Sequence, residues 1–344
     1  MVMWRFIVLL ICLSVSFTAK SREIVDATGQ STDVPDHIER VIAAGPPAAI
    51  FLYSLAPDLM LGWPSRFNDK IIGFLGEPAK SMPVIGSIGG KTGSESNIER
   101  LMMLKPDLII DLGNSGSTNV SIAQRAKNRT KIPFLLYEGR LTALPHAYRE
   151  VGALLGKKAE GEMRAEWIEK RLDEIKQVVE KVPYDKRPRI YYARGQSGLE
   201  SGASQSIHAE TIEFSGGRNV TGEAMGNQGI LHLSMDEIMA FDPDMIVASD
   251  PRFIETIKSD ANWQNLRAVK NGKVVVAPSL PFSTIDMPPS VNRVIGAVWL
   301  TNKLYPELYP IDMTRQIEEF YSLFYHVKLD EKGVLNLFQL PESK

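Results

Sequence analysis

The chain has 344 residues, of which 44% are hydrophobic and 23% charged, and its formal net charge is −2. This length suits two domains, each large enough to bury a core of its own, and the composition is that of a globular protein. The mild acidity, without any block of basic residues, argues against nucleic acid as a partner.

The first 20 residues have the pattern of a secretory signal peptide. Arg5 precedes an apolar run from Phe6 to Leu13, and small residues follow up to Ala19. The run is too short to span a membrane, so we predict cleavage near Ala19 and export of the chain, with a retained N-terminal anchor as the alternative. The single cysteine, Cys12, lies inside this segment, and the exported chain would therefore have no disulfide and no catalytic thiol.

Strand and helix patterns alternate in the first half of the chain. An extended segment with a Thr-Gly turn begins at Ile24. The strands expected after it are residues 41–44, 59–63, 108–111 and 132–138, and the expected helices are residues 46–55, 96–105, 121–129 and 145–155. This order is typical of an α/β domain.

A long amphipathic helix is expected from Lys157 to Val182, at the seam between the two halves of the chain. The stretch contains no proline and only one glycine, Gly161, and Pro183 and Pro188 follow it. Its apolar residues recur at helical spacing and form one stripe: Met163, Trp167, Ile168, Leu172, Ile175 and Val179. At about 1.5 Å per residue this helix would be roughly 35 to 40 Å long, enough to hold two lobes at a nearly fixed separation.

The second half repeats the same alternation. Strands are expected at residues 189–195, 244–248 and 272–278, and helices at residues 208–217, 234–241, 285–306 and 311–326, the last with Ile317, Phe320 and Phe324 on one face. We therefore predict an α/β fold of two three-layer α/β lobes joined by one long backbone α-helix. The predicted parts are a signal peptide (1–19), an N-terminal lobe (20–156), the linking helix (157–182) and a C-terminal lobe with a terminal helix (183–344).

A weak internal repeat relates the two halves. Residues 98–110 resemble residues 235–247: aligning Pro106 with Pro243 places Asp107 on Asp244. The similarity is too low for a tandem array and indicates a shared helix–strand architecture.

Motifs for catalysis are incomplete. The phosphate-loop pattern around SIGGKTG has Ile85 where glycine is needed, and GQSGL has Leu199 in place of the second glycine of a nucleophile elbow. The five histidines, at positions 37, 146, 208, 232 and 326, show no metal-binding spacing, although His208 and His232 fall near predicted loops of the second lobe.

Basic and aromatic residues lie in or near the loops that follow predicted strands. In an open α/β sheet, ligands bind outside the carboxyl ends of the strands, so these side chains would line a basic, aromatic cleft suited to an anionic ligand. The candidate ligand-binding residues are Trp63, Arg66, Lys91, Tyr137, Arg140, Tyr192, Arg194 and Arg252. The alternative is that they are solvated or paired with carboxylates.

Equivalent acids open the two helices of the repeat. Glu99 and Asp236 each stand seven residues before the aligned prolines. They could contact a partner that bears arginines. Capping boxes from Ser96 to Glu99 and from Ser234 to Glu237 are the competing explanation, and the second box would leave Asp236 free.

Several stretches together are similar to one family. RVIAAGPPAAIFLYSLAPDLMLGW, SNIERLMMLKPDLII, LSMDEIMAFDPDMIV and NWQNLRAVKNGKVVVAP, with one long helix between the lobes, resemble the helical-backbone substrate-binding proteins of ABC importers. The resemblance implies a monomeric periplasmic protein that grips a ligand between its lobes, performs no chemistry and needs no cofactor. It also implies docking through Glu99 and either Asp236 or Glu237 on arginines of an ABC permease dimer, which works in the inner membrane with its ATPase.

The ligand predicted from this resemblance and from the basic loops is a metal chelate, a ferric siderophore or a related anionic complex. Molybdate or tungstate, a nickel complex, haem and cobalamin are the alternatives within the family. From other classes, the alternatives are a secreted chelatase-like enzyme and a sensor or adhesion domain. A stiff linking helix further predicts a lobe closure of only a few degrees.

Overall fold

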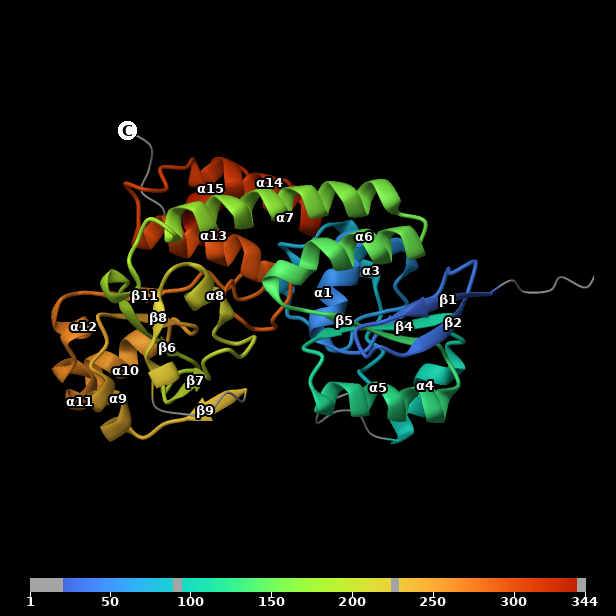
Figure 1. Ribbon diagram of the computed structural model, residues 1–344, viewed down its shortest axis with the longest axis horizontal. Helices are drawn as coiled ribbons and strands as arrows, with labels where there is room; N and C mark the ends of the chain where they lie inside the picture. Colours follow the sequence, from blue (N-terminus) through green and yellow to red (C-terminus); the bar gives the residue numbers. More distant parts are fainter. Residues whose placement is uncertain (1–20, 89–94, 224–228, 339–344) are drawn as a thin grey trace, which may run out of the picture.

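The computed structural model describes residues 21–88, 95–223 and 229–338 and consists of two α/β lobes beside each other along one long helix (Figure 1). This arrangement confirms the predicted fold class. The predicted signal peptide and Cys12 lie outside the described residues. None of the helices in the described ranges is both long enough and apolar enough to cross a membrane.

The first lobe is built on a three-stranded parallel sheet in the order β3-β4-β5. Its strands are β3 (Val41–Ala43), β4 (Leu108–Gly113) and β5 (Phe134–Glu138), preceded by an antiparallel hairpin of β1 (Ser21–Val25) and β2 (Ser31–Pro35). Its helices are α1 (Pro46–Leu55), α2 (Asp69–Ile72), α3 (Glu77–Ser81), α4 (Glu95–Met103), α5 (Ser117–Thr130) and α6 (Leu144–Leu154). Successive residues of a strand point to opposite layers: Ile109 shares a core with α4 and α5, whereas Ile110 shares one with α1 and α6.

The predicted strand at residues 59–63 is wrong as a continuous strand. Pro57–Leu59 is a turn of 3₁₀ helix, and the chain after it makes only isolated bridges, from Met60 to Val41 and from Trp63 to Val84. Pro57 disfavours a helical conformation at Ala56, which ends α1, and its own fixed φ suits the 3₁₀ turn that precedes the bridges.

The second lobe holds a four-stranded parallel sheet in the order β11-β10-β6-β8. The strands are β6 (Arg189–Ala193), β8 (Arg218–Asn219), β10 (Met245–Ala248) and β11 (Val274–Val276). The helices are α8 (Glu210–Phe214), α9 (Met235–Phe241), α10 (Phe253–Ser259), α11 (Ala261–Asn265) and α12 (Arg267–Lys270). A small antiparallel pair, β7 (Glu200–Gly202) with β9 (Ile230–His232), is a feature that the sequence patterns did not predict.

Hydrogen bonds confirm the internal repeat. The amide of Asp107 donates to the carbonyl of Arg40 at 2.8 Å, and the amide of Asp244 donates to the carbonyl of Arg189 at 2.8 Å. Each aspartate carboxylate also accepts from the amide of the same arginine, at 2.9 Å in the first lobe and 2.8 Å in the second. The units α4–β4 and α9–β10 are therefore equivalent, and each is joined in the same way to the start of the first strand of its parallel sheet, at Arg40 just before β3 and at Arg189, the first residue of β6.

The linking helix is α7 (Lys158–Val179), with 22 residues and a length of about 33 Å. Its buried face includes Ile168, Leu172 and Ile175, as the apolar stripe predicts. Met163, however, is 57% exposed, so its place in that stripe is wrong. Arg164 is buried instead, because its guanidinium donates to the carbonyl of Leu323 at 2.9 Å.

Gly161 explains the one interruption in the helix sequence. A Cβ at this position would lie 2.4 Å from the carbonyl oxygen of Tyr148 on α6. Gly152 of α6 lies opposite, and its own Cβ would lie 3.0 Å from the Cα of Gly161. The two helices therefore cross at backbone contact, which anchors α7 on the first lobe.

The last helices join both lobes. They are α13 (Asn292–Leu304), α14 (Met313–Tyr325) and α15 (Glu331–Phe338), and Figure 1 shows them beside α7. Ile317, Phe320 and Phe324 of α14 are buried, as predicted. The carbonyl of Tyr325 accepts from the amide of Gly76, so the end of α14 is bonded to the first lobe although it follows the second in sequence.

A histidine at this junction makes stability depend on pH. Burial lowers the pKa of His326, although a hydrogen bond between its Nε2 and the Tyr53 carbonyl, 3.0 Å apart, opposes the shift. Below about pH 6.5 His326 is protonated in the unfolded chain, whereas in the folded chain, where its pKa is lower, it stays neutral to a lower pH. The contribution of His326 is therefore complete above that pH, and we expect it to decline as the pH falls towards the folded-state pKa.

Thermal unfolding at about pH 7.5 and about pH 5.5, on either side of the unfolded pKa, measures this effect. The control is His326→Asn, since the backbone φ of 57° at this position is one that asparagine tolerates. The unchanged protein should lose more stability between the two pH values than the variant does. Equal losses would exclude His326 as a source of the pH dependence.

Candidate ligand site between the lobes

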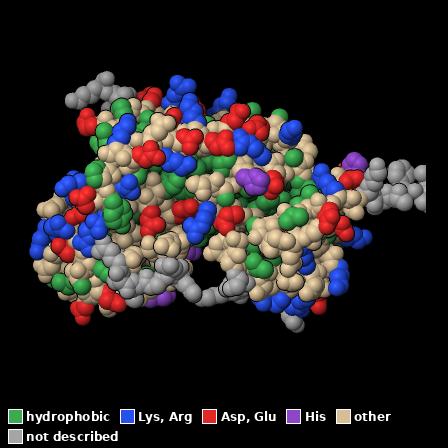
Figure 2. Space-filling model, in the orientation of Figure 1, with side chains coloured by type: hydrophobic (Ala, Val, Ile, Leu, Met, Phe, Trp, Pro, Cys, Tyr) green, Lys and Arg blue, Asp and Glu red, His purple; other side chains and the backbone are tan. Residues whose placement is uncertain are grey.

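The loop after β5 and the loop after β7 connect the two lobes. Figure 2 shows the surface hollowed between the lobes on the side away from α7. Arg140, which follows β5, donates from Nη2 to the carbonyl oxygen of Gln205 in the second lobe at 2.9 Å. In open α/β sheets this edge, beyond the carboxyl ends of the strands, is where ligands bind.

Asp286 is the centre of a polar cluster at the same edge of the second lobe. Its side chain is fully buried, and its carboxylate accepts a hydrogen bond from the hydroxyl of Tyr192. The other oxygen lies 3.0 Å from Nε of Arg194 and 2.8 Å from Nδ1 of His208. A buried carboxylate is stable only when it is paired and hydrogen-bonded in this way.

The cluster fixes the hydrogen-bonding state of its members. Burial and the neighbouring Asp286 carboxylate raise the pKa of Tyr192 well above its ordinary value, so its hydroxyl remains a donor. With Asp286 as acceptor, Nδ1 of His208 is the donor of their 2.8 Å hydrogen bond, and Nε2 is left on the other side of the ring. The His208 side chain is 22% exposed, against 8% for Arg194, so the imidazole is the more accessible of the two.

The segment that carries Asp286 is held tightly against α13. A Cβ at Gly296 would overlap the carbonyl oxygen of Thr284, so only glycine permits this approach. Thr211 of α8 donates from its hydroxyl to the carbonyl of Ile285 at 2.8 Å. These contacts hold the backbone just before Asp286, whose carboxylate pairs with Arg194 and His208.

A second buried pair joins the lobes directly. Arg293 of α13 is fully buried and donates to the Glu210 carboxylate and to the carbonyl oxygen of Gly139 in the first lobe. The Glu210 carboxylate, in turn, accepts from the amide of Leu141 at 3.1 Å. Burial lowers the pKa of Arg293, and the Glu210 carboxylate opposes that shift.

The predicted site residues fall into different environments. Arg140 contacts the Gln205 carbonyl across the lobes, and Arg194 pairs with Asp286 within the second lobe. Trp63, Tyr137 and Tyr192 are buried. Arg66 and Arg252 are exposed, and Arg252 is paired with Asp250 at 2.6 Å. Lys91 lies outside the described residues. Direct ligand contact by these residues stays a prediction, and the burial of the three aromatic side chains favours supporting roles for them.

Sequence patterns did not identify Asp286, Glu210 and Arg293. Each had a local signal: Asp286 and Arg293 are isolated charges within apolar segments, and Glu210 opens a short helix. A charge within an apolar segment is buried only if it has a partner. That charged partner could not be named from the sequence, because His208 lies 78 residues from Asp286 and Glu210 lies 83 residues from Arg293.

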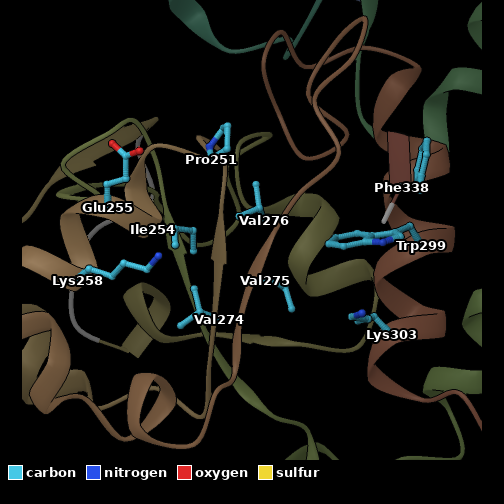
Figure 3. A pocket seen from close by; sticks show the side chains of 10 residues that line it. All are labelled: Pro251, Ile254, Glu255, Lys258, Val274, Val275, Val276, Trp299, Lys303 and Phe338. Atoms are coloured by element: carbon cyan, nitrogen blue, oxygen red, sulfur yellow. The ribbon is translucent and has the colours of Figure 1, made fainter. Parts of the chain in front are cut away.

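A separate hollow of about 560 Å³ lies at the open edge of the second sheet (Figure 3). The valines of β11 form one wall, and Trp299 and Lys303 of α13 lie across from them. None of the predicted ligand residues lines it, so it is distinct from the site between the lobes.

Comparison with known proteins places this architecture in a class. Residues 76–280 match the family model described as "Periplasmic binding protein", which covers more than half of the chain. The chain belongs to the periplasmic binding protein family, as the sequence resemblance predicts.

Individual relatives within this family are binding proteins for small ligands. The chain is 24% identical to the molybdate-binding protein MolA of Haemophilus influenzae over 92% of this chain and 95% of that protein. It is 26% identical to the Fe(3+)-citrate-binding protein YfmC of Bacillus subtilis over 53% of this chain and 57% of that protein. An ABC transporter solute-binding protein from Sulfurospirillum deleyianum superposes with a TM-score of 0.84 and 29% identity, over 93% of this chain and 99% of that one.

The protein is thus a periplasmic-type substrate-binding protein of an ABC transporter, a class that binds small ligands and works with a permease. Proteins of this class function in transport rather than in catalysis. They act outside the cytoplasm.

Proposed function

We propose that this protein captures a small anionic metal complex between its lobes, in the periplasm, and delivers it to an ABC permease. The observation that carries the proposal is the contact of Arg140 on one lobe with the carbonyl of Gln205 on the other, three residues before His208 of the Arg194–Asp286–His208 cluster. A ferric siderophore or a related ferric chelate is the ligand class that we put first. The similarity to a ferric citrate-binding protein supports it.

The donors of the site suit an anion with several acceptor oxygens. Arg140 is exposed and anchored only by one described hydrogen bond to a carbonyl, so its remaining N–H groups can turn to a ligand. The positive charge of Arg194 is balanced by the carboxylate of Asp286 and by that of Glu200, 3.4 Å away. Arg194 therefore contributes oriented hydrogen-bond donors more than net charge. The site therefore recognises oxygen atoms by directed hydrogen bonds.

Molybdate or tungstate is the second candidate. The MolA relative matches this chain over 95% of its own length. Arg140 and Arg194 could donate hydrogen bonds to a compact oxyanion as well as to a chelate. A nickel complex, haem and cobalamin complete the set of ligands to be compared.

Docking on the permease is proposed to use one acid per lobe. Glu99 of α4 and Asp236 of α9 are both exposed. Glu237 is occupied locally: its carboxylate accepts from the amide and hydroxyl of Ser234 at 2.7 Å, and these bonds lower its pKa. This capping box confirms the local explanation for Glu237 and favours Asp236 as the docking residue. The Ser96 side chain is not among the described ones, so the corresponding box from Ser96 to Glu99 stays a prediction.

A ligand panel tests the proposed site. The exported chain, from residue 20 onward, would be titrated with ferric catecholate, ferric hydroxamate, ferric citrate, molybdate, tungstate, nickel–histidine, haem and cobalamin, and binding followed by tryptophan fluorescence. Arg140→Ala and Arg194→Ala should each weaken the ligand that binds best by roughly ten- to a hundredfold, because each removes hydrogen bonds from a charged donor.

The matched control is Arg315→Ala, since Arg315 is exposed on α14 and paired only with Glu319 in the same helix. It should leave the affinity unchanged. Unchanged affinity in both cleft variants would show that the ligand is not held by this basic edge. Recovery of the ligand unaltered, at one molecule per chain, would separate binding from a chelatase-like activity.

A further inference from the structure

Three exposed methionines lie on the two helices that the internal repeat relates. Met102 and Met103, at the end of α4, are 38% and 81% exposed, and Met239 of α9 is 39% exposed. They are three of the nine large hydrophobic side chains that are exposed in the described part of the chain. Single exposed apolar residues need no explanation, but their grouping at two equivalent places does.

The repeat places these side chains in register with the two exposed acids. When Pro106 is aligned with Pro243, Met102 falls on Met239 and Glu99 falls on Asp236. In each helix the methionine is three residues after the acid, so the two side chains share one helix face. The equivalent hydrogen bonds of Asp107 and Asp244 hold both units in the same orientation relative to their sheets.

The two faces are arranged for one partner that spans both lobes. Figure 1 shows α4 and α9 in different lobes, each on the side of the molecule away from α7. Related surfaces on two similar lobes match a partner with two equivalent subunits. An acid beside a flexible thioether complements an apolar surface that carries a cation, and methionine adapts its shape to such a surface.

We propose that Met102, Met103 and Met239 are apolar anchors for the permease. The methionines of α4 would pack beside the contact of Glu99 on one permease subunit, and Met239 of α9 would pack beside the contact of Asp236 on the equivalent subunit. This inference rests on the proposed docking function and adds to it the part of the interface that excludes water. Desolvation strengthens the adjacent ionic contacts, and buried apolar anchors carry much of the binding energy in such interfaces.

The test is the affinity of the protein for its permease–ATPase complex in lipid nanodiscs, by biolayer interferometry, without ligand and with sodium molybdate or ferric citrate added. The triple variant Met102→Ser, Met103→Ser, Met239→Ser should bind at least tenfold more weakly. Met163→Ser is the matched control, because Met163 is 57% exposed on α7 and lies on neither face. The control should bind like the unchanged protein.

A second pair of variants, Glu99→Arg and Asp236→Arg, separates this inference from the proposed function. If both acid reversals abolish binding and the triple methionine variant does not weaken it, the apolar anchors are wrong and the docking acids stand. If the acid reversals have no effect, the docking face itself is wrong. Circular dichroism of each variant establishes that the helices have kept their structure.

Discussion

Replacing Asp286 by Ala should destabilise the protein by about 3 to 5 kcal/mol, the usual cost of removing one partner of a buried ion pair. The change leaves the Tyr192 hydroxyl without its acceptor and removes the buried counter-charge of Arg194. It also frees His208 to rotate, because its ring is held through Nδ1. We therefore expect a large loss of stability together with a loss of ligand affinity.

Urea unfolding and melting temperature measure the first effect, and titration with the best-binding member of the ligand panel measures the second. A fall in melting temperature of roughly 6 °C or more corresponds to the expected loss. Asp250→Ala is the control, because Asp250 also follows a strand of the second sheet and pairs with an arginine, Arg252, that is 65% exposed. Asp250 itself is 15% exposed, but a pair whose cation is in solvent contributes about 0 to 1 kcal/mol, so similar losses in the two variants would contradict the central role of Asp286.

The fold could be predicted from the sequence to the extent that local patterns determine it. The strand of residues 108–111 and the helix of residues 311–326 were found because their apolar spacing matches one period and their ends carry proline or glycine. The internal repeat was found from a few shared positions around Pro106 and Pro243. It holds in the structure because Asp107 and Asp244 bind the backbone in the same way.

The predictions failed where the local sequence pattern does not determine which side chain is buried or which segment forms a strand. Met163 fits the apolar stripe by spacing, yet Arg164 is the buried neighbour, because its guanidinium reaches a carbonyl of α14 more than 150 residues away. The small β7–β9 pair escaped prediction because its three-residue strands carry polar residues such as Glu200 and His232. Such segments show no periodicity that could distinguish a strand from a loop.

The candidate site was predictable only in its outline. The rule that ligands bind beyond the carboxyl ends of strands led to Arg140, which contacts the other lobe, and to Arg194, which pairs with Asp286 in its own lobe. The rule says nothing about the acids that orient these side chains. Asp286 and Glu210 reach the interface through long connections, so only the assembled fold reveals which cations are already paired.

Because its partners are known only from the assembled fold, Arg293 is the most informative position for testing what holds the two lobes together. Arg293→Met should cost about 3 to 5 kcal/mol, because it leaves the mostly buried Glu210 carboxylate without its cation. It also removes the donor to the Gly139 carbonyl, a direct contact between the lobes. We expect faster amide hydrogen exchange at Leu141 and in the segment from Gln205 to Glu210, measured by mass spectrometry.

Two further variants test whether the lost Arg293–Glu210 ion pair causes the loss of stability and the faster exchange. Arg315→Met removes an exposed pair within α14 and should cost only about 0.3 to 0.5 kcal/mol, without altering exchange between the lobes. Glu210→Gln, added to Arg293→Met, removes the unpaired charge and should recover part of the lost stability, because the two side chains act as one unit. A double variant less stable than Arg293→Met alone would mean that Glu210 stabilises the interface mainly through the Leu141 amide. The buried pair would then contribute less to holding the lobes together than the geometry indicates.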